Sequence, residues 1–172
     1  EGNWTGYGNQ PGTGMAHLFN YAGAPWLTQK WVRKVKAAYS DVTPYGGYRD
    51  DEDQGQMGAL GVLMAIGLFE VDGGCAEKPF YEITSPLFDK VTIHLDNRYY
   101  PGKTFQIITV GNSADNMYIQ RASFNGKKWN KCWFYHEDFI KGGTLELQLG
   151  TTPNKKWGIE EFPPSSVSSD KD

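Results

Sequence analysis

The spacing of apolar and polar residues divides the chain into a helical first part and a strand-rich second part. Trp31, Val32, Val35 and Tyr39 recur at helical spacing, while lysine and arginine fill the opposite face. Pro25 stands where this pattern begins, and proline is favoured in the first turn of a helix. We therefore predict a helix from Pro25 to about Tyr39.

A second helix is predicted from near Asp53 to about Phe69, after a loop rich in proline and glycine. Its body, from Met57 to Phe69, is apolar on nearly every side, which is typical of a helix buried on most sides. A chain of 172 residues can hardly bury such a helix completely, so we expect further helices from another part of the molecule to cover it. The glycine-rich residues 1–23 are predicted to be a loop.

After Pro79 apolar residues alternate with polar ones, which is the pattern of half-buried strands. The predicted strands cover residues 90–95, 104–110, 117–123, 133–135 and 144–149. Short turns separate them, and Asn125-Gly126 is a strong hairpin signal. This arrangement predicts an antiparallel sheet or half of a β-sandwich. The serine-rich tail from Pro163 is predicted to be disordered.

Composition narrows the classes of function without choosing one. A net charge of −3 with 22% charged residues gives no general reason to bind nucleic acid or an anionic membrane. No apolar run approaches the roughly 20 residues that a transmembrane helix needs. Aromatic residues make up 15% of the chain, and composition alone favours an aromatic core over sugar-stacking surfaces. Cys75 and Cys132 can pair, but two buried thiols are the favoured interpretation.

The acidic run around residue 51 is the most informative chemical feature. Asp51 and Asp53 stand two residues apart where a loop meets the second predicted helix, so both carboxylates can face one cavity. The helix N-terminus and a nearby cation would keep at least one of them ionised, which suits a general base acting on water. Acidic helix caps are common, however, and the run alone favours a cap. An EF-hand is excluded because Val62 stands where its bidentate glutamate belongs.

The glycine-rich segment 6–14 has neither the ending of a phosphate-binding Walker loop nor a preceding strand. Asn9 and Gln10 supply amide oxygens that can bind calcium, although the spacing alone favours a plain turn. No zinc-binding spacing connects the three histidines, His17, His94 and His136. Taken singly, these features leave the function open.

Three segments match, in order, the sequence motifs of one enzyme family. Gly8-Asn-Gln-Pro11 is similar to a Gly-Asn-Glu-Pro loop, and residues 19–29 are similar to a Tyr-Asn-Tyr-Ala-Gly-x-Pro-Trp-Lys-Thr-Gln helix entry. Residues 51–57 are similar to an Asp-Glu-Asp-x-Gly-x-Met segment, and further matches continue as far as Gly158. The chain thus resembles glycoside hydrolase family 92, the calcium-dependent exo-α-mannosidases.

This resemblance implies an α+β fold, in which residues 1–78 form the last helices of an (α/α)6 barrel. Residues 79–162 would form a C-terminal antiparallel β-sheet or half sandwich, and residues 163–172 a disordered polar tail. The chain starts at Glu1 without a methionine or a signal peptide, so we expect it to be cut from a longer polypeptide. The remaining N-terminal part of the same enzyme would then be its partner.

The same resemblance implies inverting, calcium-dependent hydrolysis of terminal α-mannose from glycans, as in N-glycan degradation. Asp53 matches the general base, and Asp51 assists it or shares its role. Asn9, Gln10 and Asp53 match the calcium ligands, while Asn9 and Trp26 would lie near the bound mannose. Enzymes of this kind are usually exported, so we expect a secreted or periplasmic protein.

Two departures from the family pattern limit what this chain can do alone. The family's loop has glutamate where this chain has Gln10, which replaces a carboxylate by one neutral oxygen and can weaken calcium binding. The family's general acid lies upstream, and Glu1 is too close to Gly8 to match it. We therefore expect the isolated chain to be inactive.

Other functions stay open at this point. The chain can be a noncatalytic carbohydrate-binding fragment or a degenerate relative, in which case it binds mannose without hydrolysing it. It can belong to a family member that acts on phosphodiester-linked mannose, where an upstream acid is less needed. Another α/α-barrel enzyme, such as a disaccharide phosphorylase, would instead need phosphate to form its product.

Overall fold

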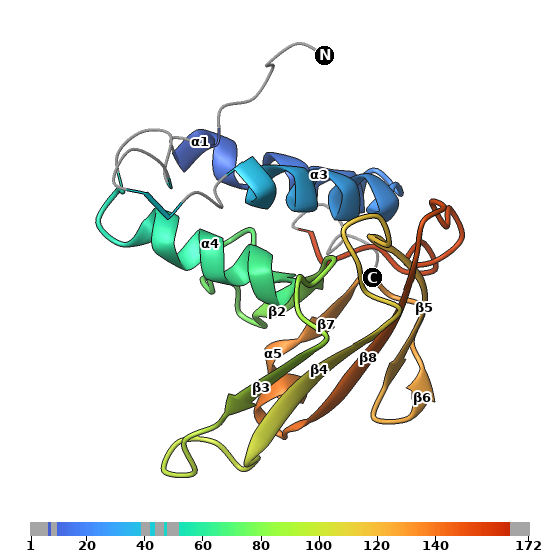
Figure 1. Ribbon diagram of the computed structural model, residues 1–172. Helices are drawn as coiled ribbons and strands as arrows, with labels where there is room; N and C mark the ends of the chain where they lie inside the picture. The colour runs from blue at the N-terminus through green and yellow to red at the C-terminus, as the bar shows by residue number, and fades with distance from the viewer. Residues whose placement is uncertain (1–6, 8–9, 39–41, 44–46, 48–51, 166–172) are drawn as a thin grey trace.

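The computed structural model describes residues 7, 10–38, 42, 43, 47 and 52–165, and it places a helical layer against two β-sheets (Figure 1). The helical layer contains α1 (Gln10–Thr13), the 3-10 helix η1 (Met15–His17), α2 (Leu18–Tyr21), α3 (Pro25–Ala38) and α4 (Gln56–Ile66). The remaining elements are β1 (Leu68–Phe69), β2 (Phe80–Ile83), β3 (Lys90–His94), β4 (Thr104–Val110), β5 (Tyr118–Phe124), β6 (Lys127–Lys128), β7 (Trp133–Tyr135), α5 (His136–Ile140) and β8 (Gly143–Gly150). The predicted α+β fold class is confirmed.

The glycine-rich N-terminal segment, predicted to be a loop, forms three short helical turns instead, α1, η1 and α2. Their inner side is buried, because Ala16, His17 and Asn20 are all less than 5% exposed. Helices of three or four residues are not stable alone in water, so packing against α3 holds these turns in place. Local glycine content could not predict this tertiary support.

The predicted first long helix is confirmed as α3, and α4 runs antiparallel to it (Figure 1). The second helix is shorter than predicted at both ends. It begins at Gln56 because the three preceding residues have left-handed backbone. It ends at Ile66 because Gly67, with a φ of 81°, turns the chain and donates its N–H to the Leu63 carbonyl at 3.0 Å.

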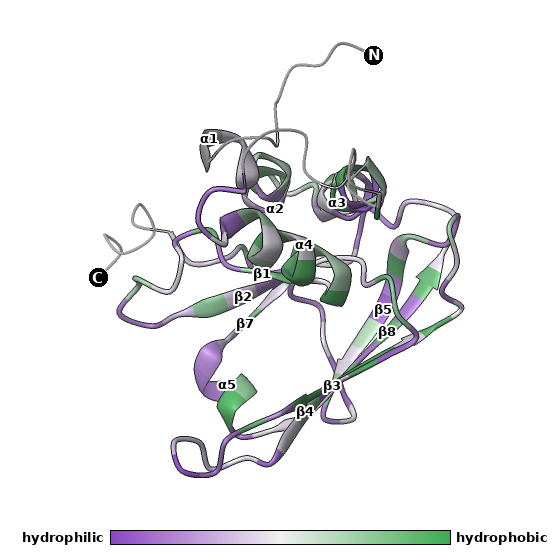
Figure 2. Ribbon diagram, turned by 60° about the vertical axis from the view of Figure 1, so that its left-hand side comes forward, coloured by the Kyte–Doolittle hydropathy of each residue, from purple (hydrophilic) through white to green (hydrophobic). Residues whose placement is uncertain are grey.

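One side of α4 packs on α3, and the other side is open. Met57, Leu60 and Met64 are buried together with Val32 of α3. The opposite side carries Val62, which is 60% exposed and borders a mostly apolar groove of about 540 Å³. Figure 2 shows the apolar character of this helix. The part of the chain that the structure describes therefore does not bury α4 on all sides.

The strands form a three-stranded sheet in the order β1-β2-β7 and a five-stranded sheet in the order β3-β4-β8-β5-β6. All five predicted strands are present, as is the hairpin at Asn125-Gly126, whereas β1, β2 and the two-residue strand β6 were not predicted. Neighbours pair antiparallel except β4 and β8, which are parallel, with Phe105 opposite Gly143. The antiparallel prediction is wrong for this one pair, because the chain returns to β4 only after forming β5, β6, β7 and α5.

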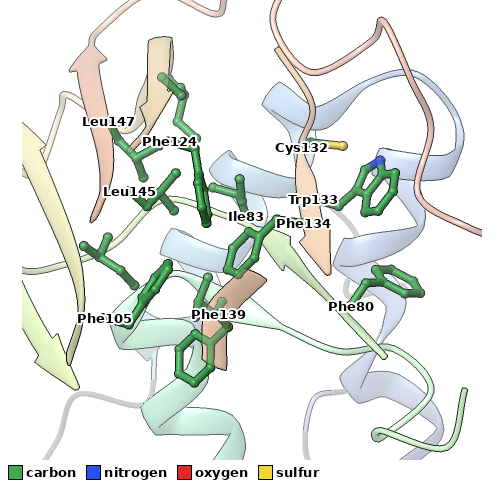
Figure 3. Packing of buried hydrophobic residues seen from close by; sticks show 14 of the residues in the cluster. Phe80, Ile83, Phe105, Phe124, Cys132, Trp133, Phe134, Phe139, Leu145 and Leu147 are labelled. Carbon is green, nitrogen blue, oxygen red and sulfur yellow. The ribbon is translucent and has the colours of Figure 1, made fainter. Parts of the chain in front are cut away.

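The main hydrophobic core lies between the two sheets and is rich in aromatic rings (Figure 3). Phe105 of β4 stacks on Phe134 of β7 with ring centroids 5.6 Å apart, and Phe124 of β5 lies 5.3 Å from Phe134. The aromatic-core interpretation of the composition therefore holds. Cys132 is buried in this core, whereas Cys75 is exposed, and the two are unpaired.

The helical and strand regions are in contact across the predicted boundary after residue 78. β1 pairs with β2 across it, and Gln29 of α3 accepts a hydrogen bond from the backbone N–H of Ile119 at 2.9 Å. The boundary itself stays a prediction. Most of the predicted disordered tail, residues 166–172, lies outside the described residues. Within the described ranges no helix is long and apolar enough to cross a membrane.

Candidate active site

A left-handed turn leads into α4 and contains Asp53, the predicted general base. Asp53, Gln54 and Gly55 have φ angles of 56°, 59° and 99°, a backbone conformation that residues with side chains rarely adopt. Hydrogen bonds close the turn, from the Gln56 N–H to the Asp53 carbonyl at 3.3 Å and from the Met57 N–H to the residue 52 carbonyl at 3.1 Å. The turn therefore fixes the direction in which the chain enters the helix.

Glu52 provides the acidic cap of α4. One of its carboxylate oxygens accepts the backbone N–H of Gly55, and the other accepts the N–H of Gly58 at 3.1 Å. Both N–H groups stand at the helix N-terminus, where no intrahelical acceptor is available. The negative charge also interacts favourably with the helix dipole. The cap expected from the acidic run thus exists, and Glu52 supplies it.

The Asp53 carboxylate is left for another role. Its Oδ2 atom is buried, and no hydrogen-bond partner for it exists among the residues that the structure describes. Removing a carboxylate oxygen from water is costly unless a donor or a cation compensates it. Carboxylate oxygens are also the ligands that calcium prefers. Asp53 therefore fits both predicted roles, that of a base facing water and that of a metal ligand.

The other predicted calcium and catalytic residues are only partly within the described part of the chain. Gln10 is the first residue of α1, but its side chain lies outside it, as do Asn9 and Asp51. Among the residues that the structure does describe, no group of three or more His, Cys, Asp or Glu side chains could hold a metal ion. The calcium site with amide ligands from Asn9 and Gln10 stays a prediction.

Packing nevertheless brings the segment around Gln10 to the end of the helical layer where α4 begins (Figure 1). Tyr7 and Ala16, at the two ends of this segment, are buried in the same apolar cluster as Met57. The Tyr7 hydroxyl also accepts a hydrogen bond from the Ala16 N–H at 2.8 Å, which closes the segment into a loop. The residues that flank this segment therefore pack in the same apolar cluster as Met57, which closely follows the Asp53 turn.

A buried polar network, which the sequence analysis did not predict, ties this segment to the strands. Glu82 of β2 is 0% exposed, and its Oε2 lies 2.8 Å from His17 Nδ1. The same oxygen accepts a hydrogen bond from Asn20 Nδ2 at 2.7 Å, while the His17 ring stacks on Phe69 at 3.8 Å. The partners are more than 60 residues apart, so no local spacing could reveal the network. A glutamate within an apolar strand was the one available signal.

Two neighbours of Glu82, Cys132 and Tyr21, have raised pKa values. Burial, and after it the Glu82 carboxylate, raises the pKa of the Cys132 thiol to about 12. The same two effects raise the pKa of the Tyr21 hydroxyl. Neither group ionises at neutral pH, so the network holds no reactive thiolate or phenolate. Its contacts tie the N-terminal segment to β2.

Trp26, predicted to lie near the substrate, is in the first turn of α3. Its ring is half-buried, and Lys155 Nζ lies 5.7 Å from the ring centroid. At the other end of α3, Lys36 lines the groove beside Met57, so this is the end that lies next to the start of α4. The helix between Trp26 and Lys36 is about 15 Å long. The structure therefore does not bring Trp26 together with Asp53, and its substrate-binding role stays a prediction.

Comparison with known proteins extends these observations. The family model of the glycosyl hydrolase family 92 catalytic domain matches residues 2–151. A relative described as an uncharacterized secreted glycosidase, from Arthroderma benhamiae, is 36% identical over 163 residues, covering 92% of this chain and 20% of the relative. The sequence is thus similar to a glycosidase over nearly all of its length.

Two solved structures from Bacteroides thetaiotaomicron have a similar fold. A family 92 inverting mannosidase gives a TM-score of 0.81 at 37% identity, covering 92% of this chain and 21% of that protein. A family 92 α-mannosidase gives a TM-score of 0.81 at 30% identity, with the same coverage. The chain spans about a fifth of the length of the relatives it matches.

Proposed function

Because this chain belongs to glycosyl hydrolase family 92, we propose that it is part of an inverting, calcium-dependent exo-α-mannosidase that removes terminal α-mannose from glycans. The chain would supply the general base and part of the calcium site. Since it spans about a fifth of its relatives, the activity belongs to the complete enzyme and not to this chain alone. The similarity to a secreted glycosidase supports an exported enzyme.

One observation carries the proposal: the buried Oδ2 atom of Asp53, which lacks a partner within the described residues. An aspartate at the start of a helix ordinarily caps it. Here the Glu52 carboxylate accepts the N–H groups of Gly55 and Gly58, so capping does not account for an aspartate at position 53 in a left-handed turn. A carboxylate with a free, desolvated oxygen suits a base that takes a proton from water.

Inverting hydrolysis needs two carboxyl groups on opposite sides of the bond that breaks. The base takes a proton from water as the water oxygen attacks the anomeric carbon, and the acid protonates the departing oxygen. The two groups stand roughly 6.5–9.5 Å apart, which leaves room for the water. We assign the base to Asp53, assisted by Asp51, and the acid to the remaining part of the enzyme. Calcium bound by Asn9, Gln10 and Asp53 would supply positive charge that orients water and sugar hydroxyls.

The remaining part of the enzyme is also the partner that we propose for the open side of α4. The groove there is lined mainly by apolar residues, and exposed Val62, Leu87 and Phe88 border it. Lys36 adds a positive charge at its edge. An apolar helix carrying carboxylates, from the four fifths of the relatives' length that this chain does not span, has the chemistry that fits this groove.

Replacement of Asp53 by asparagine in the complete enzyme tests the base role. Asparagine keeps the size of the side chain but cannot take a proton, so kcat for an aryl α-mannoside is expected to fall by about 100- to 10,000-fold. KM should change little, because the substrate still binds. Initial rates at saturating calcium measure both constants.

The matched control is Asp115→Asn, at an exposed position in the loop between β4 and β5, which should leave kcat unchanged. Full activity in the Asp53→Asn enzyme would remove Asp53 from the role of base. Mannose binding without hydrolysis by the unmodified enzyme would instead support a noncatalytic carbohydrate-binding protein.

A further inference from the structure

We infer that Glu52 is a positioning residue, which holds the left-handed turn that aims Asp53 and acts on the reaction through Asp53. The inference rests on the proposed function, because it takes Asp53 as the base. Glu52 itself is not assigned a contact with substrate. Its effect is on the geometry of its neighbour.

The contacts of Glu52 span the turn from one side to the other. One carboxylate oxygen accepts the N–H of Gly55, the last residue of the turn, and the other accepts the N–H of Gly58 at 3.1 Å, in the first turn of α4. One rigid, planar group therefore connects the turn to the helix. The turn cannot rotate relative to α4 without breaking one of these two charge-assisted hydrogen bonds.

The turn needs such support because its conformation is unfavourable. Asp53 and Gln54 both carry side chains and both have positive φ angles, 56° and 59°. Consecutive residues of this kind persist only where the surroundings over-determine them. Two backbone hydrogen bonds, at 3.1 and 3.3 Å, close the turn but do not reach Gly58. The Glu52 carboxylate supplies the additional constraint.

Glu52 also prevents Asp53 from turning back toward the helix. The N–H groups at a helix N-terminus attract any nearby aspartate. While Glu52 occupies the N–H groups of Gly55 and Gly58, the Asp53 carboxylate is free to keep its Oδ2 directed elsewhere. Without Glu52, Asp53 is the adjacent carboxylate able to take over the cap, and a base used as a cap is lost to catalysis.

Two variants of the complete enzyme disturb the turn by independent means. Glu52→Gln leaves one acceptor oxygen for two N–H groups. Gly55→Ala leaves the cap intact but places a side chain at a φ of 99°, where the added Cβ meets nothing within 4 Å. A displacement of the base by about 1 Å costs roughly 100-fold in rate. We expect each variant to lower kcat for an aryl α-mannoside by about 10- to 100-fold, with a much smaller change in KM.

Gly126→Ala is the matched control for the backbone change. Gly126 has a φ of 76° and also meets nothing within 4 Å, but it lies in the β5–β6 hairpin. Both Gly126→Ala and Gly55→Ala should lower the melting temperature by a few degrees. Gly126→Ala should leave kcat unchanged. A kcat in either turn variant that equals the Gly126→Ala value would overturn the inference.

A double-mutant cycle separates positioning from a merely structural effect. In an Asp53→Asn background the carboxylate that Glu52 positions is already gone, so Glu52→Gln should lower the residual kcat no further. An additional loss as large as in the unmodified enzyme would mean that Glu52 acts independently of Asp53. Full activity of the Asp53→Asn enzyme itself would contradict the proposed function, which is a different outcome from the failure of Glu52 as a positioning residue.

Discussion

At the scale of single residues, Glu82 connects the N-terminal helical turns to the sheet. Its Oε2 contacts both His17 and Asn20, and all three side chains are at most 1% exposed. Removing the carboxylate would leave two buried polar groups unpaired, which costs more than the net gain from forming the contacts.

We expect Glu82→Ala to lower the free energy of unfolding by about 3–5 kcal/mol. Glu82→Gln should cost less, because its amide oxygen still accepts one hydrogen bond. The control is Glu146→Ala at an exposed position of β8, expected to stay within about 0.5 kcal/mol of the unmodified protein. Denaturant unfolding measures all three variants. Equal effects of Glu82→Ala and Glu146→Ala would mean that the network contributes nothing.

The candidate site illustrates how far single residues could be predicted. The position of Asp53 at a loop-to-helix junction alone favoured a cap, and the family resemblance assigned it as the base. The structure leaves its Oδ2 without a partner among the described residues, and the base role stays a prediction. The cap by Glu52 was not assigned, because three neighbouring acidic residues have the same local propensity. The contact between His17 and Glu82 was not predictable either, because it depends on how the chain folds back over 65 residues.

At the scale of elements, helical spacing predicted where α3 and α4 lie, and backbone conformation decided where they end. The strands were predicted from alternation, but their order was not, because alternation carries no information about neighbours. β8 lies between β4 and β5, and its parallel pairing with β4 joins residues 38 positions apart at Phe105 and Gly143. Such pairing is set by the packing of the whole core.

Gly67, which ends α4, stands at a position where close packing leaves no room for a side chain. It has a φ of 81°, and an added Cβ would lie 2.5 Å from Pro86 Cγ and 2.9 Å from Pro86 N. We expect Gly67→Ala to lower the free energy of unfolding by about 2–5 kcal/mol, from the left-handed backbone and the overlap together. Gly126→Ala carries the backbone cost alone and should lose about 1–2 kcal/mol.

Thermal and denaturant unfolding of the two variants checks the difference. If Gly67→Ala loses no more stability than Gly126→Ala, Pro86 can move aside and the close packing at the end of α4 is not required.

At the scale of the whole molecule, the open side of α4 is a surface that the described residues of this chain leave uncovered. The apolar body of the helix predicted that other parts of the molecule would cover it. In the described part of the chain α3 and β1 cover parts of α4, but its outer side is not covered, and Val62 stays 60% exposed. A chain that spans about a fifth of its relatives leaves ample polypeptide to provide the missing cover.

We expect Val62→Lys to affect the isolated chain and the complete enzyme in different ways. In the isolated chain it should reduce binding of a hydrophobic dye, because it places a charge on the exposed apolar groove. In the complete enzyme it should lower the melting temperature by several degrees, because the charge would be buried at an interface. The matched control is Val110→Lys, at a 50% exposed position at the end of β4. It should change neither the dye binding of the isolated chain nor the melting temperature of the complete enzyme. Unchanged stability of the complete Val62→Lys enzyme would show that this side of α4 faces solvent there.

The place of β8 in the sheet has a consequence for how the protein is made. β8 is hydrogen-bonded to β4 and β5 at once, yet it follows both of them in the chain, after β6, β7 and α5. While β3 to β7 emerge, the middle of the five-stranded sheet is missing, and the facing edges of β4 and β5 have no partner. Unpaired strand edges are the surfaces through which nascent chains associate. We therefore expect a nascent chain that ends before residue 143 to expose both of these strand edges to association.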